Sequence, residues 1–131
     1  MGTEDIQKPT LLIEGDLTEK ILAAAFKIQN SLGCGFLEKV YENALLVEFS
    51  RAGVPVEQQK ALKVKYEGAV VGDYVADLVV DDRVIVECKA TTHNDPVYEA
   101  QLLNYLKATG IRVGLLVNFG RPKIHYRRLI V

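Results

Sequence analysis

Two acidic residues and one lysine interrupt strongly apolar segments near the middle of the chain. Asp77 and Glu87 are each flanked by aliphatic residues, and Lys89 lies two positions after Glu87. A lone ionised carboxylate in an apolar strand costs several kcal/mol or takes up a proton. A divalent metal ion would remove this cost, and an ion held by two acids beside a lysine can hydrolyse phosphodiester bonds. The residue types therefore indicate a metal-dependent phosphodiesterase site.

The segment between the two acids predicts that they face each other across a hairpin. If Asp81-Asp82-Arg83 is a three-residue loop, Asp77 faces Glu87. Facing residues of an antiparallel pair have Cβ atoms about 5 Å apart. Residues two apart, such as Glu87 and Lys89, lie on the same face of a strand. The three side chains are thus expected to converge, whereas a turn different by one residue would move one strand's side chains to the other face.

The expected ligands suit Mg²⁺ or Mn²⁺. Mg²⁺ prefers hard oxygen ligands in octahedral geometry and keeps several waters. Asp77 and Glu87 would bind the ion with the backbone carbonyl of Cys88, leaving room for water and a phosphate oxygen. Lys89 would orient the attacking water or neutralise the scissile phosphate. The alternative is a surface hairpin with solvated charges, and the aliphatic residues on both faces of these strands argue against it.

Two predicted helices add candidate residues. Gln101 and Tyr105 are four positions apart on one helix face, and both can hydrogen-bond a phosphate or a lysine. Glu38 lies in the first turn of an earlier helix, where the helix dipole favours a carboxylate. It also lies near the apolar stripe of that helix, so it could lean toward the sheet as a third carboxylate. Each has an ordinary alternative: the polar edge of an amphipathic helix, or a solvated first-turn acid.

Hydrophobic periodicity predicts the element order ααβββαββ. The predicted helices and strands span about 16–32, 36–52, 56–66, 70–80, 84–90, 96–109, 113–119 and 123–131. Asp16 and Glu19 have the spacing of a capping box, and Asp95 with Pro96 forms an N-cap and first-turn pair. A helix between two apolar strands predicts a crossover within one mixed sheet. The expected fold class is therefore α/β, with helices packed on the sheet.

Composition fits a single domain with a real core. The chain has 131 residues, of which 49% are hydrophobic and 25% are charged. Residues 1 to about 12 have little apolar pattern and are expected to be flexible. No apolar run could span a membrane and no signal peptide is visible, so a soluble, cytoplasmic protein is expected. The net charge of -1 neither indicates nor excludes a nucleic-acid binder.

The two cysteines and the basic C-terminal segment have ordinary interpretations. Cys34 and Cys88 lack zinc-finger spacing and are expected to be reduced thiols. Cys88 alternates with Glu87, so its side chain should pack on the other side of the sheet. The segment 121–128 contains four Lys or Arg residues. It could contact a nucleic-acid backbone or protect an edge strand by charge, and the sequence favours neither.

The motifs taken together resemble a known family. The pattern Gly35-x-x-Glu38-x-x-Tyr41 matches the signature of the small bacterial and archaeal GxxExxY proteins, which resemble the PD-(D/E)XK nuclease superfamily. The resemblance extends over roughly residues 14–131. One position departs from the pattern, because Ala76 stands where many members of the superfamily have proline.

The resemblance implies a restriction-endonuclease-like fold with an αβββαβ core. It implies that Asp77 and Glu87 are metal ligands, that Lys89 is the catalytic lysine and that Glu38 is the helix acid of the site. Gln101 and Tyr105 are similar to the Q-x-x-x-Y motif of RecB-like nucleases.

The sequence therefore predicts a nuclease that uses Mg²⁺ or Mn²⁺. We expect nucleic acid as its partner, DNA before RNA, and no membrane. Little room is left for a separate recognition domain, so sequence specificity would need a second copy of the chain or a protein partner. The alternative is a catalytically silent module that keeps the fold and binds nucleic acid or protein.

Overall fold

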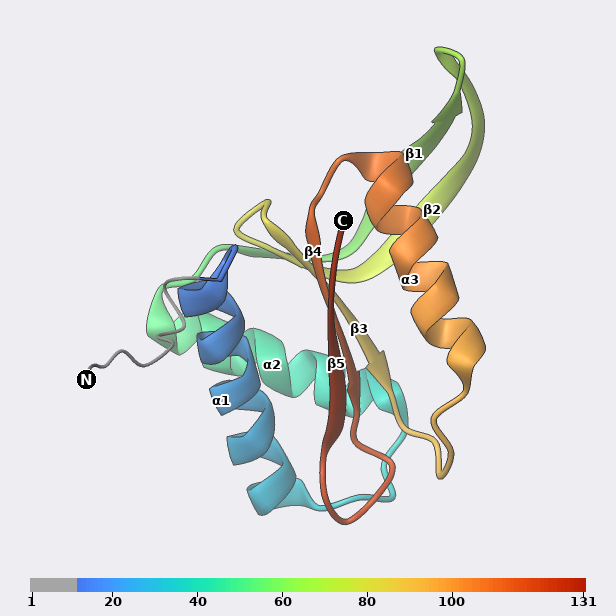
Figure 1. The fold of residues 1–131 in the computed structure, drawn as a ribbon. Helices are drawn as coiled ribbons and strands as arrows, with labels where there is room; N and C mark the ends of the chain where they lie inside the picture. The colour runs from blue at the N-terminus through green and yellow to red at the C-terminus, as the bar shows by residue number, and fades with distance from the viewer. Residues whose placement is uncertain (1–11) are drawn as a thin grey trace, which may run out of the picture.

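The computed structural model describes residues 12–131 as a five-stranded mixed sheet with helices on both faces (Figure 1). The strand order follows the chain, and β3 pairs in parallel with β4 while the other pairs are antiparallel. The elements are α1 (Gly15–Leu32), α2 (Glu38–Ala52), β1 (Val56–Tyr66), β2 (Ala69–Val80), β3 (Val84–Lys89), α3 (Pro96–Thr109), β4 (Val113–Asn118) and β5 (His125–Ile130). The α/β class and the order ααβββαββ are confirmed. The flexible start predicted from the sequence falls largely on residues 1–11, which lie outside the described residues.

The two faces of the sheet carry separate hydrophobic cores. Helices α1 and α2 pack on one face, and α3, the crossover between β3 and β4, packs on the other (Figure 1). Large buried residues of the α1–α2 side are Ile21, Tyr41, Leu45, Leu115 and Phe119. Those of the α3 side are Tyr74, Ile85, Leu102, Leu106 and Leu116. Burying one such side chain contributes about 1.5–3 kcal/mol, so the two layers together fix β3 and β4 in the middle.

The turn between β2 and β3 has the predicted length. Val80 pairs with Val84, which makes Asp81-Asp82-Arg83 the loop. Asp81 and Asp82 have left-handed φ values of 52° and 55°, which Asp tolerates better than most residues. The Arg83 amide closes the turn by donating to the Val80 carbonyl at 3.0 Å.

The start of α1 differs from the prediction. The helix begins at Gly15, so Asp16 is already inside the first turn and the expected capping box with Glu19 is wrong. Glu14 occupies the N-cap position with φ 55° and no side-chain cap. Its carbonyl accepts the Thr18 amide at 2.9 Å, which starts the helix earlier than expected.

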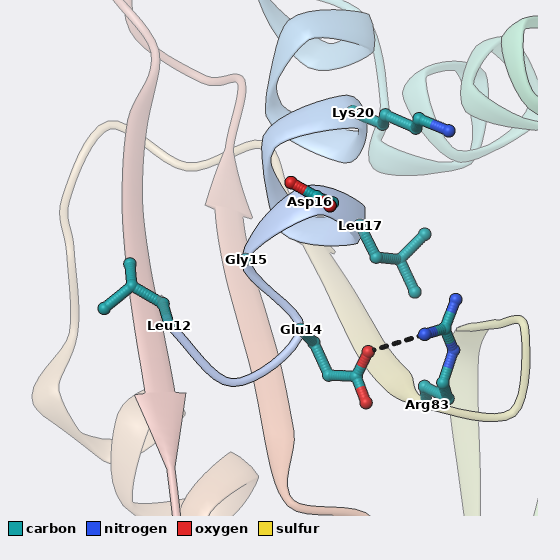
Figure 2. Close-up of a pocket in the computed structure, with 7 residues that line it drawn as sticks. All are labelled: Leu12, Glu14, Gly15, Asp16, Leu17, Lys20 and Arg83. Carbon is teal, nitrogen blue, oxygen red and sulfur yellow. Dashed lines mark hydrogen bonds and ion pairs between the residues drawn. The ribbon is translucent and has the colours of Figure 1, made fainter. Parts of the chain in front are cut away.

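The side chain of Glu14 is used elsewhere. Its carboxylate and the Arg83 guanidinium point toward one another and pair at 2.9 Å, across a hollow at the start of α1 (Figure 2). Arg83 also pairs with Asp81 at 2.6 Å. The Glu14–Arg83 ion pair therefore links the start of α1 to the β2–β3 turn.

Tyr41 fixes the connection between α1 and α2. Its hydroxyl donates to the Gly33 carbonyl at 2.6 Å and accepts from the Phe36 amide at 3.3 Å. Its ring stacks on Phe119, just after β4, with centroids 4.5 Å apart. Gly35 has φ 115°, which glycine adopts without steric cost. The motif residues Gly35 and Tyr41 therefore position the first turns of α2 near the ends of β3 and β4.

Among residues 12–131, no helix is long and apolar enough to cross a membrane.

Candidate active site

The ladder between β2 and β3 ends where the two acids begin. Backbone pairing runs from Val80 and Val84 to Leu78 and Val86. Asp77 and Glu87 occupy the next position in this register.

At that position, side-chain carboxylates replace backbone carbonyls as the hydrogen-bond acceptors. The Asp77 amide donates to Glu87 Oε2 at 3.1 Å, and the Cys88 amide donates to Asp77 Oδ2 at 2.9 Å. Each carboxylate therefore binds an amide of the opposite strand. The two acids lie together, as the three-residue loop predicts.

Partial burial raises the pKa of both acids. Desolvation, reinforced by the charge of Asp77, raises the pKa of Glu87 to about 7, although hydrogen bonds from Tyr74 and the Asp77 amide oppose the change. Desolvation likewise raises the pKa of Asp77; the Cys88 amide opposes this, and the charge of Glu42 adds to it. Two neighbouring, half-buried acids whose charged forms are both disfavoured favour a cation between them.

Tyr74 is a site residue that the sequence did not reveal. Its hydroxyl donates to Glu87 Oε2, and its ring stacks on Tyr105 of α3 with centroids 3.5 Å apart. Burial, followed by the charge of Glu87, raises the pKa of Tyr74 well above its ordinary value, so the hydroxyl stays a donor at neutral pH. Tyr105 thus reaches the acid pair through Tyr74.

Strand β2 is irregular at Asp77, which explains why Tyr74 escaped prediction. Ala76 lies in the core under α3, whereas Leu78 lies in the core under α1 and α2. Alternate residues of a regular strand share a face. The change of face between Ala76 and Leu78 cannot be read from strand alternation.

Gln59 of β1 lies at the same irregularity. It has φ 52° in mid-strand, which is uncommon for a residue other than glycine and costs on the order of 1 kcal/mol or more. Its Nε2 donates to Glu42 Oε1 at 2.9 Å and lies 3.4 Å from Asp77 Oδ1. Gln59 therefore joins the hairpin to α2 at the site.

Helix α2 presents Glu42 to the site more closely than Glu38. Glu42 is only 2% exposed, and its Oε1 accepts from Gln58 Nε2 at 2.7 Å and pairs with Lys39 at 3.0 Å. Glu38 is exposed in the first turn, as its position predicts, and its charge contributes to raising the pKa of Cys88. Sequence reasoning missed Glu42, although it lies one helical turn after Glu38 and next to the buried Tyr41.

Lys89 lies beside an aromatic ring of α3. Its Nζ is 4.2 Å from the centroid of Tyr98, a cation–π contact. Its positive charge opposes the rise in pKa of both Asp77 and Glu87. One hollow is lined by Tyr74, Glu87, Lys89, Tyr98, Gln101, Leu102, Tyr105 and Leu116. The structure therefore brings Lys89, the exposed Gln101 and Tyr105 together at Glu87.

Cys88 packs as predicted. Its side chain is fully buried in the core under α1 and α2, and burial raises its pKa well above the ordinary value. Its amide contacts Asp77. The thiol is therefore neutral and faces away from the acids.

The donor set suits a hard divalent cation. Within residues 12–131, no group of three or more His, Cys, Asp or Glu side chains is arranged to hold a metal ion. Asp77 and Glu87 supply two neighbouring carboxylates, and Mg²⁺ is commonly bound through one or two carboxylates together with water and substrate phosphates. The fit therefore depends on substrate and water to complete the coordination.

Comparison with known proteins identifies a family and a similar fold. The family model described as the PD-(D/E)XK nuclease superfamily matches residues 15–129. A solved structure, described as the crystal structure of SSO0001, is similar in fold with a TM-score of 0.53 and 14% sequence identity. The similarity covers 93% of this chain and 62% of that one, so this chain spans less than two thirds of its length. No curated protein matches the chain significantly in sequence.

Proposed function

The chain belongs to the PD-(D/E)XK nuclease superfamily, and from this membership we propose that it is a metal-dependent nuclease. The reaction is hydrolysis of phosphodiester bonds in nucleic acid. The observation that carries the proposal is the end of the β2–β3 ladder, where Asp77 and Glu87 each bind an amide of the opposite strand. A sheet that served only as a scaffold would gain stability from apolar residues at these positions.

Asp77 and Glu87 would hold Mg²⁺ or Mn²⁺, with the Cys88 carbonyl as a further oxygen ligand. When bound, the ion would supply Lewis-acid stabilisation of the negative charge that develops on the scissile phosphate. No third acid is arranged beside these two acids in the described residues, so a further acidic ligand from α2, Glu42 or Glu38, would have to move toward the ion when it binds. Glu42 is the better candidate because it shares the Gln59 amide with Asp77.

The other side chains would orient the reactants. Lys89 Nζ would donate a hydrogen bond to the attacking water or the scissile phosphate, and Tyr98 would restrict its position. Tyr74 holds the Glu87 carboxylate in place, and Tyr105 supports Tyr74 by stacking. Gln101 would donate to a phosphate oxygen from the rim of the same hollow.

The proposal extends to the smaller group of GxxExxY proteins. Two residues of the motif Gly35-x-x-Glu38-x-x-Tyr41 have structural roles in the α1–α2 connection. Gly35 adopts the positive φ of the turn, and the Tyr41 hydroxyl donates a hydrogen bond to the Gly33 carbonyl. Glu38 starts the helix that carries Glu42 to the site.

The test is cleavage of labelled single- and double-stranded DNA and RNA with Mg²⁺ or Mn²⁺, against EDTA. We expect metal-dependent cleavage by the wild type and a loss of about 100-fold or more in Glu87→Gln and Lys89→Met. Glu19→Gln, on the exposed face of α1, is the matched control and should cleave as the wild type does. Cleavage that survives in Glu87→Gln would mark a contaminating nuclease, and absence of cleavage on all substrates would favour a catalytically silent binding module.

A further inference from the structure

Strand β5 brings two basic side chains into line with the candidate active site. In the register of β3 and β4, Glu87 aligns with Leu116 and Lys89 with Asn118. In the register of β4 and β5, Leu116 aligns with Arg127 and Asn118 with His125.

Aligned residues of neighbouring strands point to the same face of a sheet. Arg127 therefore lies in the row of Glu87, and His125 lies in the row of Lys89. Both belong to the α3 face.

Tyr126 and Arg128, which alternate with these two basic residues along β5, lie on the opposite face of the sheet. Tyr126 packs edge-on against Phe26 of α1 with ring centroids 6.2 Å apart. Arg128 donates a hydrogen bond to the Ile13 carbonyl before α1. The basic C-terminal segment is thus divided by strand alternation, and only one side of it turns toward the acids.

Two neighbouring hollows lie between the acids and this edge strand. The hollow at Glu87 shares Lys89, Tyr98 and Leu116 with a second hollow, which His125 and Arg127 also line. Its remaining lining residues are Asn94, Asp95, Glu99 and Asn118. The second hollow therefore begins at the candidate catalytic lysine and ends at the sheet edge.

The guanidinium of Arg127 is available to an anion. Its side chain is 56% exposed, and its acidic partner is Glu99 at 3.5 Å. An exposed ion pair of this kind contributes little, with a median of about 0–1 kcal/mol, so a phosphate could displace Glu99. The planar fork of arginine donors matches the oxygens of a phosphate.

The separation fits a nucleic-acid strand. Neighbouring strands lie about 4.8 Å apart, so β5 lies roughly 10 Å from β3. The axial rise of a stacked strand is about 3.4 Å per nucleotide. Consecutive phosphates are farther apart than this rise, because the backbone winds round the axis. The distance therefore reaches a phosphate close to the scissile one on the same strand.

We propose that Arg127 and His125 bind a backbone phosphate of the nucleic-acid strand near the bond that is cut, on the side of strand β5. This inference rests on the proposed function, because that function places the scissile phosphate at Asp77 and Glu87. The site reads the phosphate backbone and not the bases, so it contributes affinity and strand direction without sequence preference.

The test is binding of a fluorescein-labelled oligonucleotide, followed by anisotropy at several NaCl concentrations with Ca²⁺ in place of Mg²⁺. In Arg127→Gln/His125→Gln we expect binding at least fivefold weaker and a salt dependence shallower by about one phosphate contact. Glu99→Gln removes the competing carboxylate and should bind severalfold more tightly than the wild type. Lys107→Gln, an exposed basic residue in the last turn of α3, is the control and should change neither quantity.

The outcomes separate the two proposals. If the wild type binds and cleaves nucleic acid while the double variant binds with unchanged affinity and salt dependence, the phosphate site is wrong and the nuclease proposal stands. If Glu99→Gln fails to tighten binding, the competition by Glu99 is refuted, and with it the position of the phosphate on Arg127. If the wild type neither binds nor cleaves any oligonucleotide, both proposals fail together.

Discussion

The carboxyl group of Glu87 accepts two hydrogen bonds, and its pKa is nevertheless raised. Tyr74 and the Asp77 amide both donate to Oε2, yet burial and the neighbouring charge of Asp77 outweigh them and raise the pKa of Glu87 to about 7. A glutamine at this position could accept both hydrogen bonds without an ionisable group, so the fold alone does not require a carboxylate here. We therefore attribute the carboxylate of Glu87 to the chemistry of the site, and we expect it to lower the stability of the metal-free protein measurably.

This penalty should appear as a dependence of stability on pH. The carboxyl of Glu87 has an ordinary pKa of 4.5 and a folded-state pKa of about 7, so between these values the folded state binds more protons than the unfolded state. The free energy of unfolding should therefore fall as the pH rises from about 4.5 to 7, by up to about 3 kcal/mol. Urea unfolding in EDTA at pH 5 and pH 8 measures the difference.

Glu87→Gln is the matched variant for this measurement. Its side-chain oxygen can accept both hydrogen bonds but cannot ionise, so the loss between pH 5 and pH 8 should shrink. Burial also raises the pKa of Asp77, so Asp77 acts in the same direction in both proteins and does not distinguish them. An equal loss in the variant and the wild type would show that Glu87 is not the group that titrates.

At the residue scale, the sequence predicts the acids better than it predicts their partners. The convergence of Asp77, Glu87 and Lys89 depends only on strand alternation and the length of one turn, and both are legible in the sequence. Tyr74 and Glu42 could not be found in this way. Tyr74 precedes the point where β2 changes face, and the rotation of α2 that buries Glu42 is set by tertiary packing.

The elements that end at the site approach each other closely. Phe119, which follows β4, donates its amide to the Lys89 carbonyl at 2.8 Å. At the next residue, Gly120, a Cβ atom would lie 2.3 Å from the Thr91 nitrogen and 2.4 Å from the Thr91 oxygen. The segments after β3 and β4 can therefore cross here only if residue 120 has no side chain.

Gly120→Ala should consequently destabilise the protein, because the clash is with backbone that cannot give way. We expect a loss of about 1–3 kcal/mol in the free energy of unfolding, and weaker catalysis because the end of β3 carries Lys89. Gly72→Ala in β2 is the control, since its Cβ would meet nothing within 4 Å. Chemical denaturation of both variants tests this, and equal stability would contradict the close crossing.

For the helices and strands, the sequence predicts their order along the chain better than the residues at which they begin and end. Glycine and proline marked the turns, and the Asp95 cap of α3 is confirmed by its bond from the Val97 amide at 3.0 Å. The start of α1 was mispredicted because Glu14 takes the N-cap position: its carbonyl accepts the Thr18 amide, and its carboxylate pairs with Arg83, distant in sequence. Contacts between segments far apart in the chain decide such ends, and a local pattern does not contain them.

At the scale of the whole molecule, the candidate site is assembled from both layers of the fold. The β2–β3 hairpin supplies the acids and Lys89, α2 approaches from one face with Glu42, and α3 approaches from the other with Tyr98 and Tyr105 (Figure 1). The middle of the sheet is held by two cores, which gives a charged site a rigid support. The order of elements predicted this arrangement in outline, and the pairing of individual side chains required the structure.

The central claim is that Asp77 and Glu87 share a divalent cation. The most direct measurement is isothermal titration calorimetry of Mn²⁺ into the wild type at pH 8, beside Glu87→Gln, Glu42→Gln, Glu38→Gln and the control Glu19→Gln. We expect saturable binding by the wild type and the control, and affinity at least tenfold lower in Glu87→Gln. We also expect a larger loss in Glu42→Gln than in Glu38→Gln, because Glu42 is linked through Gln59 to Asp77. No binding by the wild type, or equal binding by Glu87→Gln, would contradict the claim.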